Sequence, residues 1–337
     1  MKLATSSILQ SFLLITFAVL SASSVLAQAI PADAPISDQK AGSVLIFNYY
    51  GSHPVNRESE DTQVHITNTH LQKLASMSIF FIDTVSGNVT DSYICLAPNQ
   101  TASFLMSDVD PGAKGYIIAV SVDATGQPNY FNYFTGSESI KMASGHLASL
   151  NAEAISALKE SPTMPSDGGI QSGIAATLKF DGLHYNKVPG ALVLDHVPAI
   201  GDGNKTLVIV NQLGGSLLNG GKPDDLTGLT GVVYDVVTKA YFWQFGINNC
   251  QLRKVIANDF PQTGPNMSTA IAPGTYGWMK FWPHGANKGV TGAVLYLNQS
   301  VQNTTYYNPS IFTGGRNLHH LTLTTDELTI PVIPPVC

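Results

Sequence analysis

One short segment of this chain occurs twice. Residues 111–117, Pro-Gly-Ala-Lys-Gly-Tyr-Ile, return as residues 273–279, Pro-Gly-Thr-Tyr-Gly-Trp-Met. Three further landmarks precede each copy in one order: a strand-like phrase with a central asparagine, an apolar run that ends in aspartate, and a lone cysteine. They are Asn68, Asp83 and Cys95 in the first half and Asn211, Asp235 and Cys250 in the second. Four landmarks in the same order predict that the chain is a duplicated unit.

The sequence between these landmarks is typical of β-strands. The apolar segments are short, rich in β-branched and aromatic residues, and bounded by turn formers such as Ser86-Gly87-Asn88. At least six such segments lie between Ser43 and Val122, and the pattern resumes at Ala176. We therefore predict an all-β protein of two related antiparallel β-sandwich domains of the immunoglobulin type.

One segment departs from the strand pattern. Between Gly145 and Glu160 the apolar residues recur at helical spacing, with Ser149 or Asn151 as the N-cap and Lys159 in the last turn. The apolar positions are Leu147, Leu150, Ala154, Ile155 and Leu158. This spacing predicts one short helix after the first domain.

The first residues resemble a secretory signal peptide. Lys2 supplies a positive charge, residues 12–20 an apolar core, and Val25-Leu26-Ala27 a cleavage site. The apolar core is shorter than the roughly 20 residues of a membrane-spanning helix, so we expect no membrane span in the mature chain. The protein is expected to be secreted, outside the cell or at its surface, with the periplasm as the alternative. The predicted divisions are a signal peptide (1–27), a flexible leader (28–42), the first domain with its helix (43–160), a linker (161–173), and the second domain with a Pro-rich tail (174–337).

The composition limits the kinds of partner. Charged residues make up 12% of the chain, against about 25% in typical soluble proteins. The net charge is −6 and the 17 basic residues are scattered, which excludes an electrostatic surface for nucleic acid. An exterior of uncharged polar groups suits an extracellular β-protein, with a protein or glycan partner at the cell surface or with self-association.

The chain has three cysteines, an odd number for an oxidising compartment. Cys95 and Cys250 follow equivalent landmarks in separate predicted domains, which makes them poor partners for each other. Cys337 ends the domain that holds Cys250. We therefore predict a disulfide between Cys250 and Cys337, and we expect Cys95 to be a small buried hydrophobic residue.

Motifs of known catalytic or metal sites are missing from the sequence. Residues 214–218 lack the closing glycine of a nucleophile elbow, and there is no HExxH or paired CxxC motif. His319 and His320 are adjacent in a predicted strand, so their side chains point to opposite faces and cannot share a metal. Asp108 and Asp110 could face a calcium ion, but the second copy of the repeat has no carboxylate there, which favours a turn. We expect no cofactor.

The second copy of the repeat holds the main candidates for ligand binding. Period two places Trp278, Lys280 and Trp282 on one face of the strand, where exposed rings could stack on sugars. The corresponding strand of the first half, residues 116–120, is apolar on both faces, which favours a core position. Lys280 stands where Ile118 stands in the first copy, so part of this face is expected to reach solvent or a partner. Tyr306 and Tyr307, in a long loop, complete the candidate set.

Several phrases carry a resemblance to known proteins. Residues 93–104, 107–112, 144–146 and 317–324 resemble exported bacterial proteins of uncharacterised activity with tandem immunoglobulin-like domains. The resemblance covers nearly all of the mature chain and implies a bacterial, exported origin. It implies no activity, cofactor or site.

Together these features predict an exported, non-catalytic structural or adhesive protein of the cell surface or extracellular matrix. A carbohydrate-binding protein that uses Trp243, Trp278, Trp282 or the Tyr306-Tyr307 loop is the first alternative. A hydrolase with an unfamiliar site is the second alternative, for which Asp83, Asp235 and the histidines are the only candidate catalytic residues.

Overall fold

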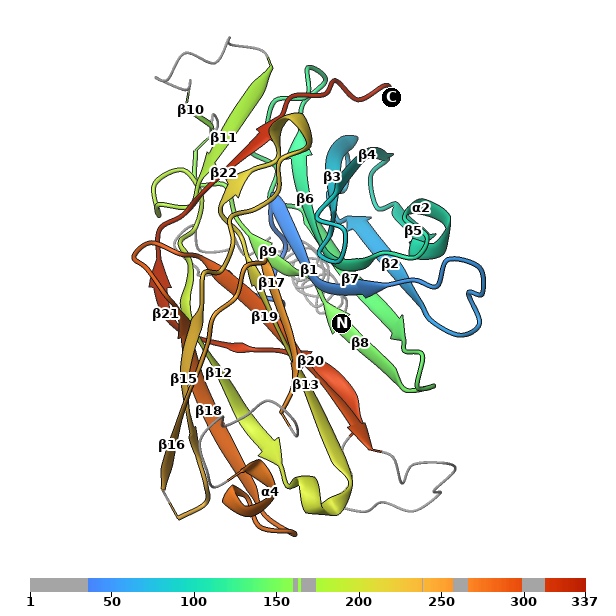
Figure 1. Cartoon of the computed structure of the whole chain (residues 1–337). Coiled ribbons are helices and arrows are strands. Elements are labelled where there is room, and N and C mark those ends of the chain that lie inside the picture. The colour runs from blue at the N-terminus through green and yellow to red at the C-terminus, as the bar shows by residue number, and fades with distance from the viewer. Residues whose placement is uncertain (1–35, 160–162, 165–173, 238, 257–265, 299–312) are drawn as a thin grey trace, which may run out of the picture. The chain divides into compact units, whose positions relative to one another are not determined.

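A computed structural model describes residues 36–159, 163–164, 174–237, 239–256, 266–298 and 313–337. Nearly all of the regular structure in these ranges is β-strand (Figure 1). The predicted signal peptide, the first part of the leader and most of the linker lie outside the described residues.

The first half of the chain forms two antiparallel sheets. Its strands are β1 (Val44–Gly51), β2 (Asp61–Asn68), β3 (Ala75–Asp83), β4 (Val89–Leu96), β5 (Thr101–Leu105), β6 (Lys114–Val122), β7 (Phe134–Lys141), β8 (Leu147–Asn151) and β9 (Glu153–Ile155). The five-stranded sheet has the order β4-β3-β6-β1-β9, and the four-stranded sheet has the order β5-β2-β7-β8. One face of each sheet contributes to a shared hydrophobic cluster that includes Phe47, Val64 and Phe81.

The second half repeats this pairing strand by strand. Its strands are β12 (Val188–Pro198), β13 (Asn204–Gln212), β15 (Leu229–Tyr234), β16 (Ala240–Phe245), β17 (Gln251–Val255), β18 (Tyr276–Pro283), β19 (Val290–Asn298), β20 (Gly314–Asn317) and β21 (His319–Thr324). They form a five-stranded sheet of order β16-β15-β18-β12-β21 and a four-stranded sheet of order β17-β13-β19-β20. The predicted duplication is therefore confirmed by the strand pairing.

The glycines of the repeated segment explain why both copies keep it. The first glycine has a positive φ in each turn, +87° at Gly112 and +75° at Gly274, which favours glycine. The second glycine, Gly115 or Gly277, lies against a carbonyl oxygen of the neighbouring strand, where a β-carbon would collide. The repeat is therefore a folding signature, because it sets a turn and a close approach between two central strands.

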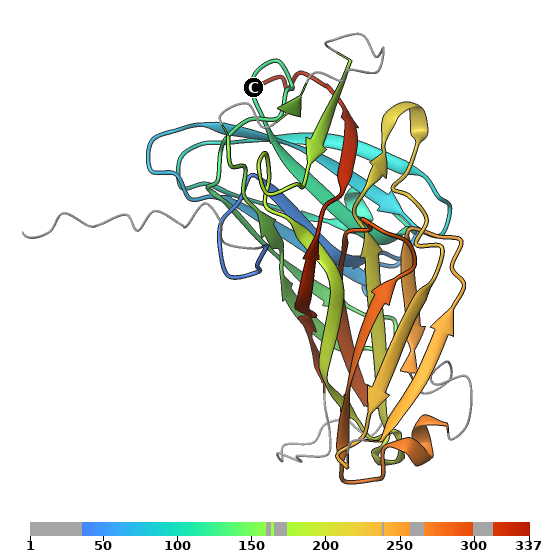
Figure 2. The same ribbon diagram turned by 90° about the vertical axis from the view of Figure 1, so that its left-hand side faces the viewer.

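A fifth sheet joins the two halves. Its strands are β10 (Thr163–Met164), β11 (Ala175–Lys179), β14 (Gly215–Ser216) and β22 (Glu327–Pro331), in the order β10-β11-β22-β14. β22 runs beside β11 in both views (Figures 1 and 2). Leu178 and Leu328 of this sheet share a hydrophobic cluster with Phe80 and Tyr116 of the first half. The five-stranded sheet of the first half is thus covered on both faces.

The prediction of two immunoglobulin-like β-sandwich domains is wrong. Another cluster joins the four-stranded sheets of the two halves through residues such as Ile140 and Leu295, and Val188 of β12 belongs to the cluster of the fifth sheet. Five small sheets are arranged as the blades of a five-bladed β-propeller. Residues Asp33–Cys337 accordingly form one compact unit. Local sequence patterns reveal strands, but they do not show which distant sheet will cover an apolar face.

The prediction of a helix between residues 145 and 160 is also wrong. This segment forms β8, which pairs with β7, and β9, which pairs with β1. Leu150 is buried while Leu147 is exposed, because side chains alternate along the strand. Ladder hydrogen bonds to two neighbours outweigh the local helical spacing. The helical segments that the structure does describe are short: α2 (Met106–Val109), α4 (Met267–Ala270), η1 (Ile200–Asp202) and η2 (Leu218–Gly220).

The disulfide differs from the predicted one. Cys337 bonds to Cys95, with their Cα atoms 5.9 Å apart, and Cys250 is a buried free thiol. Burial raises the pKa of the Cys250 thiol. The prediction failed because it assigned Cys337 to the second half. The assumed equivalence of Cys95 and Cys250 was also wrong, since Cys95 lies in β4, whose counterpart is β16, whereas Cys250 precedes β17. The tail after β22 reaches the first half, where the Ser76 hydroxyl lies 3.1 Å from the Cys337 sulfur.

Candidate functional site

Strand β18 separates its residues between the core and the surface. Gly277, Met279 and Phe281 are buried, and the latter two belong to the core of the second half. The side chains that alternate with them point to the opposite face of the sheet, away from this core. They are Tyr276 (54% exposed), Trp278 (38% exposed) and the partly buried Lys280 and Trp282. The expectation of a core strand therefore holds for one face only, and part of the other face reaches solvent at Tyr276 and Trp278.

Neighbouring strands add further rings to this outward face. Tyr234 of β15 is the cross-strand partner of Trp278, and their rings stack with centroids 4.3 Å apart and an angle of 11° between the planes. The Lys280 ammonium lies 5.8 Å from the centroid of the Tyr234 ring. Phe242 of β16 is 65% exposed and pairs with Val232, which also pairs with Lys280. We call this surface the aromatic face; it consists of Tyr234, Phe242, Tyr276, Trp278, Lys280 and Trp282.

Contacts within the protein hold the rings of the aromatic face in place. Tyr276 packs on His196 of β12 with ring centroids 5.0 Å apart. Burial, assisted by the positive charge of Arg316, lowers the pKa of His196. The stacked pair of Trp278 and Tyr234 restricts both side chains. A face ordered in this way loses little side-chain entropy when a ligand covers it.

The other aromatic candidates do not belong to this face. Trp243 is only 3% exposed and lies in the hydrophobic core, with its ring against Gly231. Tyr306 and Tyr307 lie outside the described residues. Tyr234 and Phe242 were not among the residues expected from the sequence. The available signal was the alternation of Phe242 with the core residues on either side of it.

The two adjacent histidines contact different carboxylates. His319 Nε2 lies 3.3 Å from a carboxylate oxygen of Asp195, whereas His320 Nε2 lies 3.1 Å from a carboxylate oxygen of Glu153. His320 and Glu153 line a polar pocket of about 440 Å³. Within the described ranges, no group of three or more His, Cys, Asp and Glu residues is placed to hold a metal ion.

The two carboxylates that precede the first Pro-Gly turn also have separate partners. Asp108 forms an ion pair with Arg57 at 3.0 Å, and Asp110 accepts a hydrogen bond of 2.7 Å from the Tyr50 hydroxyl. Burial raises the pKa of the Asp110 carboxyl. The interpretation of this segment as a turn is therefore favoured over a calcium site.

The pair of His320 and Glu153 predicts a pH-dependent contribution to stability. Burial lowers the pKa of His320, but the hydrogen bond and charge of Glu153, with smaller contributions from the Ile36 backbone and Asp38, raise it on balance above its ordinary value of 6.5. Protonated His320 therefore stabilises the fold. This contribution is complete below the unfolded-state pKa and is lost as the pH rises through the folded-state pKa.

The measurement is the urea midpoint between about pH 5.5 and 8.5 in the unmodified chain and in His320→Gln. The fall in stability with rising pH should be smaller in the variant. His319→Gln, which changes the exposed neighbour, is the matched control and should keep the full slope. An unchanged slope in His320→Gln would contradict the assignment.

No family model matches the chain, and no curated protein matches it either. In the part of the chain that the structure describes, no helix has the length and apolar character needed to cross a membrane. The aromatic face is thus the strongest indication of function in this protein.

Proposed function

We propose that this protein is an exported, non-catalytic adhesive protein that binds carbohydrate through its aromatic face. The observation that carries the proposal is the set of exposed and half-buried rings on one side of the sheet β16-β15-β18-β12-β21, with Trp278 stacked on Tyr234. Adjacent exposed rings on a soluble protein usually mark a binding site.

The chemistry of the aromatic face suits a sugar. The flat rings of Trp278 and Tyr276 offer apolar surface to the C–H groups of a pyranose, and the indole N–H and phenol O–H can bond its hydroxyls. Lys280 lies between Trp278 and Trp282 along β18 and adds a donor. A protein partner would also be attracted to aromatic rings, so it is the alternative that the experiment below must separate.

Export and adhesion have separate support. The signal-like leader and the disulfide between Cys95 and Cys337 both suit an oxidising compartment outside the cytoplasm. The low proportion of charged residues, 12%, leaves an exterior of uncharged polar groups that can lie against a neutral polymer. These features support a place at the cell surface or in the extracellular matrix.

Trp278→Ala tests the proposal. Removing a central, stacked ring should weaken carbohydrate binding about tenfold or more, because a few aromatic anchors dominate most binding surfaces. Binding is measured by affinity electrophoresis and by pull-down on insoluble neutral polysaccharides such as cellulose and mannan. The fold should persist, since Trp278 lies on the surface, and circular dichroism with urea unfolding verifies this.

Tyr93→Ala provides the matched control. Tyr93 of β4 is 39% exposed, close to the 38% of Trp278, but it lies on a different sheet. Its removal should leave binding unchanged. The proposal fails if Trp278→Ala binds as strongly as the unmodified chain, or if the unmodified chain binds proteins of the cell surface and no polysaccharide.

A further inference from the structure

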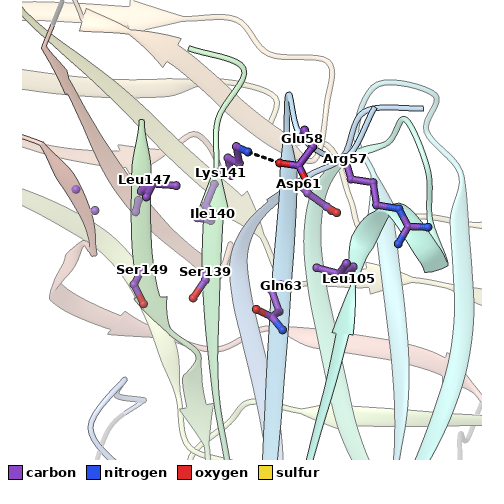
Figure 3. A pocket seen from close by; sticks show the side chains of 13 residues that line it. Arg57, Glu58, Asp61, Gln63, Leu105, Ser139, Ile140, Lys141, Leu147 and Ser149 are labelled. Atoms are coloured by element: carbon purple, nitrogen blue, oxygen red, sulfur yellow. Dashed lines mark hydrogen bonds and ion pairs between the residues drawn. The ribbon is translucent and has the colours of Figure 1, made fainter. Parts of the chain in front are cut away.

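The outward face of the sheet β5-β2-β7-β8 carries a groove of about 720 Å³. Leu105, Gln63, Ser139 and Ser149 form one row across it, because each pairs with the next on the neighbouring strand. Figure 3 shows these four side chains on adjacent strands. Gln63, Ser139 and Ser149 are exposed. The groove therefore offers an amide and two hydroxyls in a line beside an apolar side chain.

Farther along strands β2 and β5, hydrogen bonds between the two strands hold other polar side chains on the same face of the sheet. His65 Nδ1 lies 2.7 Å from the Ser103 hydroxyl, and the hydroxyls of Thr67 and Thr101 also lie 2.7 Å apart. All four side chains belong to β2 and β5. Because these bonds exist before a ligand arrives, less side-chain entropy is lost on binding.

The charged residues at the groove are paired within the protein. Lys141 Nζ lies 3.2 Å from a Glu58 oxygen, and Arg57 lies 3.0 Å from an Asp108 oxygen. Figure 3 marks the pair of Lys141 and Glu58 with a dashed line. The buried carboxylate of Asp61 accepts hydrogen bonds from the backbone N–H and the hydroxyl of Ser107. Among the residues that line the groove, the cations Arg57 and Lys141 equal the anions Glu58 and Asp61 in number, so the groove favours a neutral ligand.

The spacing of the row distinguishes two classes of extended ligand. Neighbouring strands lie about 4.8 Å apart, and the groups of the row recur at that interval. An extended peptide presents side chains on one face at every second residue, about 6.6–6.8 Å apart, and falls out of step with the row. In a chain of 1,4-linked pyranose rings, the rings follow one another at an interval close to the strand spacing. Each ring presents a hydroxyl at a given edge, although alternate rings of a β-linked chain are turned over and present different hydroxyls. The row therefore fits an extended polysaccharide better.

We infer that this groove is a second carbohydrate site, which binds an extended, neutral, 1,4-linked polysaccharide across strands β5, β2, β7 and β8. The amide of Gln63 and the hydroxyls of Ser139 and Ser149 bond successive sugar rings, and Leu105 packs against one of them. The inference rests on the proposed function in that both sites take carbohydrate. Two sites on separate sheets allow one molecule to connect two polymer chains or to hold one chain twice.

The experiment titrates the full chain with cellohexaose and with mannohexaose, by calorimetry and NMR. The unmodified chain is expected to bind two oligomers. The double variant Gln63→Ala/Ser139→Ala should lose roughly tenfold or more in affinity at one site, because two hydrogen bonds to the ligand disappear. Thr90→Ala/Ser92→Ala, which removes exposed hydroxyls from β4, is the matched control and should bind as the unmodified chain does.

The outcomes separate this inference from the proposed function. If Gln63→Ala/Ser139→Ala keeps both sites while Trp278→Ala loses one, the groove is not a site and the proposed function stands. If the groove variant loses all binding while Trp278→Ala loses none, the groove stands and the aromatic face fails. Saturation of the groove by a neutral extended peptide, or the absence of binding of either hexaose by the unmodified chain, overturns the groove assignment.

Discussion

Cys337→Ser should lower the free energy of unfolding by about 2–5 kcal/mol, the usual range for the loss of a native disulfide. The bond joins residues 242 positions apart in sequence, so its removal releases a very long closed loop in the unfolded chain. It also releases the tail from β3 and β4, which leaves β22 held in place by its pairing and packing alone. Urea unfolding under non-reducing conditions measures the loss.

Cys250→Ala is the control for this experiment. Cys250 is 1% exposed and free, so its replacement removes only packing and should cost less than Cys337→Ser. A reductant should destabilise the unmodified chain and have no effect on Cys337→Ser. Peptide mapping without reduction identifies the bond directly. A linked pair of Cys250 and Cys337 would contradict the structure and restore the pairing expected from the sequence.

Asn48→Ala should lower the free energy of unfolding by about 2–4 kcal/mol, since each buried polar group left unpaired costs about 1–3 kcal/mol. Asn48 is 1% exposed. Its amide donates to Glu153 at 3.1 Å and to Asn317 at 2.9 Å, and its side-chain oxygen accepts from Asn211 at 3.0 Å. One asparagine of β1 thus bonds β9 of its own half and two strands of the other half.

The measurement is again urea unfolding, followed by intrinsic fluorescence and by circular dichroism. Asn248→Ala, at an exposed asparagine, is the matched control and should change stability by less than about 0.5 kcal/mol. Asn48→Leu should be no better tolerated, because the bulk of leucine leaves the polar partners buried and unpaired. A cost as small as that of Asn248→Ala would show that water replaces the lost contacts.

The duplicated strand pattern was predictable from the sequence because backbone geometry dictates it. The turns need a positive φ at Gly112 and Gly274, and the strand contacts exclude a side chain at Gly115 and Gly277. Such requirements remain visible in both copies. The partner of Cys337 was not predictable, because it depends on the long return of β22 to the first half, which no local pattern records.

The candidate site was predictable only in part, for a related reason. Period two placed Trp278, Lys280 and Trp282 on one face, and the structure agrees. Whether that face is buried depends on the other sheets. The corresponding strand around Ile118 is apolar on both faces, which suggested burial in both halves, but only the strand of the first half is buried on both faces. There, the fifth sheet packs on the equivalent face and buries it. The groove beside Ser139 could not be predicted from the sequence, because its row of side chains comes from four strands whose relative register only the structure shows.

The disulfide of Cys95 and Cys337 also determines how the molecule responds to a pulling force. A tension applied at an unbonded tail would peel β22 from β11 one hydrogen bond after another, which is a weak direction for a β-sheet. With the bond in place, the same tension enters β4 through a covalent link and leaves β22 unloaded. Under the proposed function, a load between a polymer on the aromatic face and the C-terminal tail would therefore not separate β22 from β11.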